Sequence, residues 1–417
     1  MNSALSECAI AGGGPAGLML GLLLARAGVG VTVLEKHADF LRDFRGDTIH
    51  PSTMEILHEL GLLEGFLKLP HEKVPRLSGR FGDLAIPFAD FSHLPVRARF
   101  IAMMPQWDFL DFLADEASRY PDFHLAMQAE ATGLIEEKGR VVGVQAQTPA
   151  GPRDIRAGLV VAADGRHSML RQCAGLTVRN LGAPIDVLWF RLSRQPGDTA
   201  ETMGRFDPGA ILVMINRGDY WQCAYVIPKG GIDQVKAQGL AAIKARLGRS
   251  LPFPAGRVEE IASWNDFKLL TVVVDRLEQW YRPGLLCIGD AAHAMSPVGG
   301  VGVNLAVQDA VAAANILWRP LRDGRAGPEH LSQVQRRRML PTRIIQALQL
   351  AIQNDVIAPT LKSVRLARPP LPVRLLVKWP FLRRIPARLV GLGIRPEHVS
   401  DDIRRGRPAR ATGQLSS

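Results

Sequence analysis

Three glycines near the start of the chain have the spacing of a turn that binds phosphate. Gly12, Gly14 and Gly17 form a GxGxxG pattern, in which the missing side chains permit a tight turn and bring backbone close to a pyrophosphate. A helix that begins inside the motif would direct its free N–H groups at the phosphate oxygens. Glu35 lies eighteen residues after Gly17, where a carboxylate can bind ribose hydroxyls. The candidate residues of this dinucleotide site are Gly12, Gly14, Pro15, Ala16, Gly17, Glu35 and Lys36.

The neighbouring sequence predicts the strand, helix and strand that such a turn requires. Residues 7–11 and 31–34 form short apolar runs typical of buried strands, and residues 15–27 are the small and apolar residues of a helix. Together they make a βαβ unit of about thirty residues, the smallest dinucleotide-binding element. A GxGxxG pattern by itself also occurs in flexible loops, and it does not distinguish FAD from NAD.

A second motif begins with residues 285–288, an apolar run that predicts a buried strand. Gly289 and Asp290 follow at its carboxyl end, where ligands of open α/β sheets bind. Asp290 could accept hydrogen bonds from a polyol, and the glycines of the next loop leave room for a flat ring. The alternative is a structural turn between a strand and a helix. The candidate residues are Gly289, Asp290, Pro297, Gly299, Gly300, Gly302 and Asn304.

A third motif, Asp164, Gly165 and Arg166, also follows an apolar strand, expected over residues 159–163. These residues are candidates for the cofactor site through the family resemblance described below. Read alone, the motif is equally typical of an ordinary loop in which an Asp caps the next helix.

The rest of the chain predicts a mixed architecture. Residues 183–227 contain short strand-like runs separated by turns, which indicates an antiparallel sheet. Other strands are expected over residues 124–128, 132–136 and 141–147, and helices over residues 51–60, 106–120, 233–247 and 302–317. The predicted fold class is α/β, as an α+β two-domain chain with a Rossmann-like FAD-binding domain, an inserted antiparallel-sheet substrate domain and a C-terminal helical region. The FAD-binding domain is expected over residues 1–75, 101–180 and 276–324, the substrate domain over 76–100 and 181–275, and a helical, basic tail over 325–417.

The net charge of +11 is unevenly distributed. Residues 361–417 contain 13 Lys and Arg against three acidic residues, so the tail carries almost all of the excess. The body has no basic stripe with interleaved aromatics, and we expect no nucleic-acid partner. The tail mixes basic and apolar residues, which suits either a peripheral contact with an anionic membrane or a lid over the substrate domain.

Targeting and metal binding find little support in the sequence. Arg26 is the one charged residue between residues 8 and 34, but a basic leader is missing and glycines interrupt the run. We therefore expect a cytoplasmic protein, with a peripheral position at the inner face of the membrane left open by the tail. The four cysteines are not spaced for a metal site and are expected to be small buried residues.

The three motifs, in this order and spacing, resemble those of the class A FAD-dependent aromatic monooxygenases. This family is typified by para-hydroxybenzoate hydroxylase, and ubiquinone-biosynthesis and polyketide hydroxylases are similar. The resemblance covers about residues 5–320. It implies bound FAD, to which Arg45 and Gln106 would add contacts, and NADPH or NADH as a transient electron donor. By the same resemblance, O2 would add to the reduced flavin at C4a, and the hydroperoxide would hydroxylate an aromatic or polyketide-like substrate.

No acid or base is identified by the sequence. His50, Tyr220 and Tyr225 could face the substrate and polarise a phenol, although each is also a common structural residue. His293 lies inside the second motif and is expected to pack and hydrogen-bond rather than act as a base.

Other functions share the same motifs. A flavin-dependent reductase of isoprenoid lipids would consume no O2, and a membrane-associated quinone-precursor hydroxylase would use the basic tail. A flavin-dependent halogenase would need a catalytic lysine and a WxWxIP motif, which residues 220–228 match only in part. A non-enzymatic flavoprotein would bind FAD without oxidising NAD(P)H. The substrate, the choice of nicotinamide and the oligomeric state are not determined by the sequence.

Overall fold

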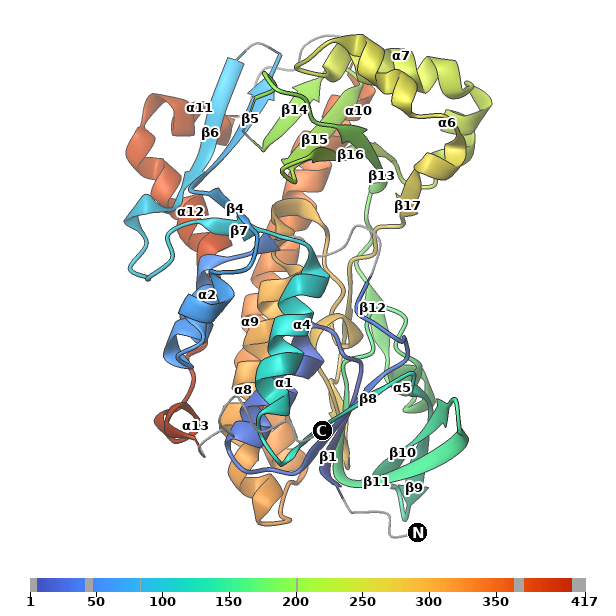
Figure 1. The fold of residues 1–417 in the computed structure, drawn as a ribbon, viewed down its shortest axis with the longest axis vertical. Helices are drawn as coiled ribbons and strands as arrows, with labels where there is room; N and C mark the ends of the chain where they lie inside the picture. The colour runs from blue at the N-terminus through green and yellow to red at the C-terminus, as the bar shows by residue number, and fades with distance from the viewer. Residues whose placement is uncertain (1–5, 42–47, 83, 200–201, 364–370, 407–417) are drawn as a thin grey trace.

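The computed structural model describes residues 6–41, 48–82, 84–199, 202–363 and 371–406 (Figure 1). Two large sheets dominate it: an eight-stranded sheet in the lower half of Figure 1 and a seven-stranded sheet in the upper half. The first contains, in order, β19 (Tyr281–Arg282), β20 (Leu285–Cys287), β11 (Gly151–Ala162), β1 (Ser6–Ala11), β2 (Val31–Glu35) and β8 (Phe123–Met127). In addition, β10 (Arg140–Thr148) pairs with β11, and β9 (Glu130–Glu137) pairs with β10.

The central strands of the first sheet are parallel, and residues 8–11, 33–35, 159–162 and 285–287 within them are buried. β11 pairs with β1 on one side and with β20 on the other, both in parallel register. Parallel strands covered on both faces are continuous apolar runs, which explains the lack of alternation over residues 7–11 and 285–288. Because these strands run in the same direction, their carboxyl ends meet at one edge of the sheet.

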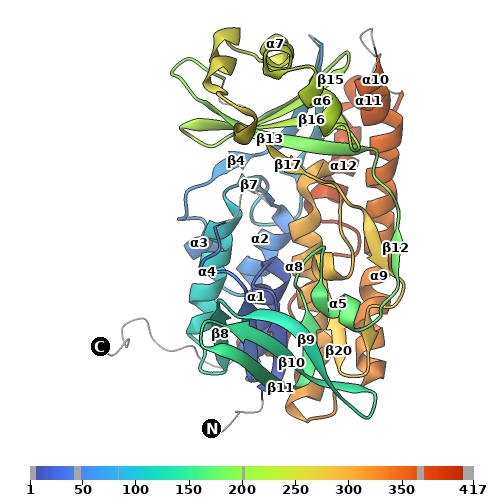
Figure 2. The same cartoon turned by 90° about the vertical axis from the view of Figure 1, so that its right-hand side faces the viewer.

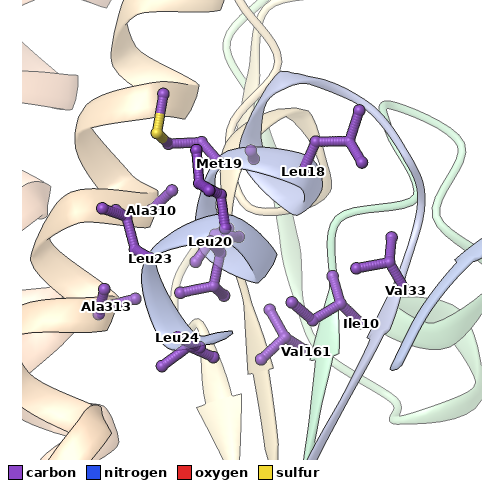
Figure 3. Packing of buried hydrophobic residues seen from close by; sticks show 14 of the residues in the cluster. Ile10, Leu18, Met19, Leu20, Leu23, Leu24, Val33, Val161, Ala310 and Ala313 are labelled. Atoms are coloured by element: carbon purple, nitrogen blue, oxygen red, sulfur yellow. The ribbon is translucent and has the colours of Figure 1, made fainter. Parts of the chain in front are cut away.

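Helix α1 (Pro15–Arg26) lies between this sheet and helix α8 (Gly302–Arg322). In Figure 3, Leu20 and Leu24 of α1 lie between strand residue Val161 and the Ala310 and Ala313 methyl groups of α8. A helix covered on all sides is apolar all round, as α1 is. Within the described residues, Val298–Arg322 is the single helix apolar and long enough to cross a membrane, and 78% of that apolar window is buried inside the protein.

The second sheet confirms the antiparallel strands expected between residues 183 and 227. Its order is β17 (Lys268–Leu270), β13 (Ile185–Ser193), β16 (Tyr220–Pro228), β15 (Ala210–Asn216), β14 (Met203–Asp207), β5 (Arg76–Phe81) and β6 (Leu84–Asp90). All pairs are antiparallel except β14 with β5. The single helix expected over residues 233–247 is wrong: Gly239, at a φ of +85°, separates α6 (Ile232–Ala237) from α7 (Leu240–Ser250).

Short elements connect the two sheets. A three-stranded sheet contains β3 (Thr48–Ile49), β7 (Ile101–Met103) and β4 (Glu72–Val74), and a two-stranded one contains β12 (Val178–Asn180) and β18 (Asp275–Leu277). The other helices are α2 (Pro51–Glu59), α3 (Leu63–Phe66), α4 (Gln106–Ser118) and α5 (Met169–Cys173), with 3₁₀ turns η1 (Phe91–His93), η2 (Ala255–Glu260), η3 (Trp264–Asp266), η4 (Gly289–Ala291) and η5 (Val298–Gly300).

The first half of the expected C-terminal tail is part of the core. α9 (Pro328–Ile352) runs along the long axis of the molecule and continues through a π-helical turn, η6 (Gln353–Ile357), into α10 (Ala358–Lys362) against the second sheet (Figure 2). After the proline-rich stretch, α11 (Leu371–Lys378), η7 (Pro380–Arg383) and α12 (Arg384–Gly391) pack on β6, and α13 (Asp401–Arg405) contacts α1.

Three of the four cysteines are buried as expected, and burial raises the pKa of their thiols. Cys173 is exposed at the end of α5, so the expectation is wrong for this residue.

Candidate functional site

The three glycine-bearing turns meet at the carboxyl edge of the parallel sheet. Gly12 follows β1 with a φ of +106°, and a Cβ there would lie 2.3 Å from the carbonyl oxygen of Ala163 in the turn after β11. Gly289 follows β20, and its Cβ would lie 3.1 Å from the Cβ of Ala16. Since each turn packs directly on another, glycine is required by the close approach of the backbones.

The start of α1 has the properties of a phosphate site. Gly14 is the N-cap residue and makes no side-chain cap, so the first N–H groups of the helix have no partner from its side chain. Among the described residues, a Cβ on Gly14 would meet nothing within 4 Å, whereas one on Gly17 would lie 1.9 Å from the oxygen of Gly12. Gly17 therefore shapes the turn, and Gly14 leaves open space before the helix amides. A diphosphate fits this arrangement.

Glu35 is tied to the glycine turn at the end of β2. One carboxylate oxygen, Oε2, accepts a hydrogen bond from the Gly13 N–H at 3.0 Å. The other, Oε1, accepts from the His37 N–H at 3.0 Å and lies 2.5 Å from His37 Nδ1. The next residue, Lys36, is exposed. Contact of Glu35 or Lys36 with a ribose remains a prediction. The existing hydrogen bonds of Glu35 do not prevent such a contact, because a carboxylate oxygen can accept more than one hydrogen bond.

The second and third motifs face each other. Arg166 Nη2 lies 4.0 Å from Asp290 Oδ2. Behind them, the buried Arg171 donates to the carbonyl oxygen of Ala291 at 3.3 Å and so joins the turn after β11 to the turn after β20. Gly165 has a φ of +85°, as a tight turn requires.

Asp164 has an incompletely used carboxylate. Its Oδ2 accepts from the Leu170 N–H at 3.2 Å, in the manner of a helix cap. Its Oδ1 is buried and has no hydrogen-bond partner among the described residues. Burial raises the pKa of this carboxyl. A buried acceptor without a partner is costly, so the site fits a ligand that offers a hydroxyl here.

The loop before α8 contains two glycines in the left-handed region, Gly299 and Gly300. The Thr48 hydroxyl donates to the carbonyl oxygen of Gly300 at 2.9 Å, and a Cβ on Gly300 would lie 2.5 Å from that hydroxyl oxygen. Asn304, in the first turn of α8, accepts from the Thr53 hydroxyl at 2.6 Å. Its Nδ2 is a buried donor without a partner in the part of the chain that the structure describes. This loop therefore lies against β3 and α2, and the Asn304 Nδ2 beside it could donate a hydrogen bond to a ligand.

A buried ionic network holds the turn after β20 from behind. Asp309 of α8 accepts from the Gly289 N–H at 3.1 Å, lies 2.5 Å from His293 Nε2, and accepts from Arg338 Nε of α9 at 2.9 Å. Arg338 also donates to Glu397 at 3.4 Å. Burial by itself raises the pKa of Asp309, but His293 and Arg338 outweigh it, so the pKa lies below its usual value. His293 has the packing and hydrogen-bonding contacts expected of it.

The three candidate acid–base residues are not brought together. His50 is fully buried, its Nδ1 hydrogen-bonds the carbonyl oxygen of Val390, and burial lowers its pKa to about 4. Tyr220 begins β16, and the Arg191 guanidinium lies 4.7 Å from its ring centroid. Tyr225 is buried in the cluster with α7 residues such as Leu247. That cluster is on the face of the sheet away from Val298 of the glycine loop, so Tyr225 is withdrawn as a candidate.

Several contributors to the site had no obvious sequence pattern. Thr48 and Thr53 bind the glycine loop and Asn304, but threonines are common in any chain. Three buried glutamines of α9 and η6, Gln346, Gln349 and Gln353, also reach the segment before that loop. Their spacing of three and four residues would place them on one helical face, which could have indicated them.

The structure does not test the cofactor contacts predicted for four other residues. Gln106 begins α4 directly after β7, and Pro297 and Gly302 flank the two glycines of the loop. Their contacts with a cofactor remain predictions. Arg45 lies outside the described residues.

The comparison with known families agrees with this geometry. A family profile described as FAD binding domain matches residues 6–347, a range that contains all three turns. The chain belongs to this FAD-binding family. Its relatives include 6-methylpretetramide 4-monooxygenase of Streptomyces rimosus, 32% identical over 98% of this chain and 97% of that protein. They also include 3-demethoxyubiquinol 3-hydroxylase of Escherichia coli K12, 26% identical over 83% of this chain and 89% of that protein. The chain is an FAD-dependent monooxygenase, an oxidoreductase.

Solved structures of other proteins share the fold. OxyS anhydrotetracycline hydroxylase from Streptomyces rimosus has a TM-score of 0.69 at 24% identity, over 93% of this chain and 76% of that one. p-Nitrophenol 4-monooxygenase PnpA from Pseudomonas putida DLL-E4 has a TM-score of 0.71 at 20% identity, over 98% of this chain and all of that one. The predicted α/β class of this FAD-dependent monooxygenase is confirmed.

Proposed function

We propose that this monooxygenase uses NAD(P)H and O2 to hydroxylate an aromatic or polyketide-like small molecule. The observation that carries the proposal is the meeting of three glycine turns at one sheet edge, beside a loop that faces an apolar sheet surface. The names of the relatives support the substrate class, because they include a pretetramide monooxygenase and a demethoxyubiquinol hydroxylase.

Each turn would hold one part of FAD. The first turn of α1 would bind the diphosphate, and Glu35 the adenosine ribose. Asp164 and Asp290 would accept hydrogen bonds from the polyol chain, and the loop with Gly299 and Gly300 would lie along the flavin ring. When bound, FAD would accept a hydride from NAD(P)H and activate O2 for transfer of one oxygen atom.

The substrate would lie against the inner face of the second sheet. Val187, Trp189, Val213 and Val226 on that face belong to the same apolar cluster as Val298 of the glycine loop. An apolar wall excludes water, which would otherwise divert reactive oxygen from the substrate. Because the pKa of His50 is lowered, we expect a neutral imidazole near pH 7 that supports the loop rather than supplying charge.

Turnover measurements test this function. We expect the purified protein to be yellow, and we expect planar polycyclic phenols to accelerate NAD(P)H oxidation with an equal uptake of O2. Substrate-dependent NAD(P)H oxidation without O2 uptake would instead identify a reductase of the isoprenoid-lipid type. FAD binding without NAD(P)H oxidation, across a broad panel of aromatic compounds, would contradict catalysis.

We further propose that the α11–α12 surface makes a peripheral contact with an anionic membrane at the cytoplasmic face. Three large apolar side chains are exposed there: Trp379 by 44%, Phe381 by 62% and Ile385 by 59%. Residues 356–396 contain nine Lys and Arg and no acidic residue. Exposed apolar anchors among basic residues suit an anionic lipid surface. The packing of α11 and α12 on β6 equally supports the alternative, a lid over the second sheet.

A Phe381→Ser, Ile385→Ser double variant separates these two possibilities. We expect the parent protein to sediment with phosphatidylglycerol vesicles at low salt and the variant to sediment less, since each lost anchor removes buried apolar area. Leu269→Ser, which changes a side chain exposed by 43% on the other edge of the sheet, is the control. Equal sedimentation of the parent and the variant, or binding to neutral phosphatidylcholine alone, would contradict the membrane contact.

A further inference from the structure

Three buried glutamines lie on one face of the long C-terminal helix. Gln346 and Gln349 are in α9, and Gln353 begins the π-helical turn η6. Their exposed fractions are 1%, 3% and 0%. Glutamine is uncommon at fully buried positions unless its amide is hydrogen-bonded, so we expect these three side chains to have hydrogen-bond partners.

The partners are backbone groups of the segment that leads into the glycine loop. Gln349 Oε1 accepts from the Ser296 N–H at 3.2 Å, and its Nε2 donates to the carbonyl oxygens of Ser296 and Val298, both at 2.9 Å. Gln346 Nε2 donates to the carbonyl oxygen of Ala294 at 3.1 Å and to that of Asp275 at 2.7 Å. The Gln349 amide therefore binds both the N–H and the carbonyl oxygen of Ser296.

The third glutamine, Gln353, contacts the segment through the side chain of Ser296 rather than through its backbone. Gln353 Nε2 donates to the Ser296 hydroxyl oxygen, which also accepts from the Val298 N–H at 3.2 Å. The loop is irregular, so its own N–H and C=O groups cannot pair within a helix or a sheet. Side chains from a rigid helix supply those hydrogen bonds and determine where the loop lies.

The same helix also contacts the second sheet. Ile352 and Ile357 pack in the apolar cluster with Val187 and Val226 of that sheet. The Gly209 N–H at the start of β15 donates to the carbonyl oxygen of Thr360 in α10 at 3.0 Å. One continuous helical segment thus holds the glycine loop and the proposed substrate wall at a fixed separation.

We propose that Gln346, Gln349 and Gln353 are positioning residues that fix the loop of Pro297, Gly299 and Gly300 against the flavin ring. This inference rests on the proposed placement of the ring along that loop. Through it, α9 sets the distance between the ring and the inner face of the second sheet. The three sequence motifs end before α9, so they do not point to a role for this helix.

The substitution Gln349→Met tests the clamp in the full-length protein loaded with FAD. Methionine keeps the volume of the side chain and removes three hydrogen bonds to the loop. We expect the dissociation constant of FAD to rise about tenfold, a free-energy change of about 1.4 kcal/mol. We also expect changed visible absorption bands and a higher fluorescence of the bound flavin, because a loosened loop admits water to the ring.

The control is Gln333→Met, the same substitution at an exposed position of the same helix. If Gln349→Met and Gln333→Met have equal flavin spectra and equal FAD affinity, the clamp is overturned while FAD binding by the parent leaves the proposed function standing. A parent protein that binds no FAD would instead overturn the proposed function. Should Gln349→Met not fold, hydrogen exchange of the parent decides: rapid exchange of the Ser296 and Val298 amides would overturn the clamp, and protection would support it.

Discussion

A Gly14→Val substitution is expected to weaken FAD binding at least about 100-fold, a free-energy change of about 2.7 kcal/mol, while the protein still folds. Gly14 has φ −79° and ψ −176°, which is extended backbone that valine adopts readily. A Cβ at this position meets none of the described residues within 4 Å, so they leave room for it. The added side chain would instead occupy the space before the α1 amides, where a diphosphate would lie.

FAD affinity measured by flavin fluorescence, with thermal unfolding of the apoprotein, checks this expectation. Gly256→Val is the control, because Gly256 also has no neighbour within 4 Å of its Cβ in the described part of the chain but lies in η2, away from the three turns. Only a small loss of stability is expected for Gly14→Val, about 1 kcal/mol from the poorer N-cap. Unchanged FAD affinity in a folded Gly14→Val protein would show that the diphosphate lies elsewhere.

Arg338→Met is expected to cost about 3–5 kcal/mol of folding free energy, the usual effect of removing one partner from a buried ion pair. Arg338 is completely buried and donates to Asp309 and Glu397, which are themselves buried. Removing the guanidinium takes one cationic partner away from each of these two buried carboxylates, in a region of low dielectric constant. Because Asp309 also accepts from the Gly289 N–H, we expect the turn after β20 to be destabilised as well.

Arg337→Met provides a matched comparison for the same measurement by urea unfolding. Arg337 is the preceding residue and also bonds Glu397, at 2.8 Å, but its side chain is 55% exposed. Water screens that ion pair, so its loss should cost no more than about 1 kcal/mol. Equal destabilisation by the two variants would mean that Arg338 contributes through packing of its stem rather than through its charge.

The two predictions concern different layers of one site. Gly14 belongs to the surface that a cofactor would contact, whereas Arg338 belongs to the support behind it. The support comes from the C-terminal part of the chain: Arg338, the three glutamines and Glu397 all lie after residue 325. The C-terminal region therefore supports the turns that would hold FAD.

The local elements around the motifs could be predicted from the sequence. The glycine turn from Gly12 to Gly17 and the turn at Gly289 follow buried strands as expected, because these patterns depend on backbone needs of neighbouring residues. The strands expected over residues 132–136 and 141–147 are present as β9 and β10, which pair across a turn of two residues. The break at Gly239 was missed because a glycine inside a helical pattern is often tolerated.

The FAD-binding family and the local structure of the three turns follow from the sequence alone, since both are encoded by short patterns whose residues act within one strand or one turn. The folded chain was needed to see that Tyr225 lies on the face of the sheet away from the glycine loop, that Asn304 meets Thr53, and that Gln349 holds the loop at Ser296. These contacts join residues that are distant in the chain. They depend on how helices and sheets pack, which the spacing of residues along the sequence does not specify.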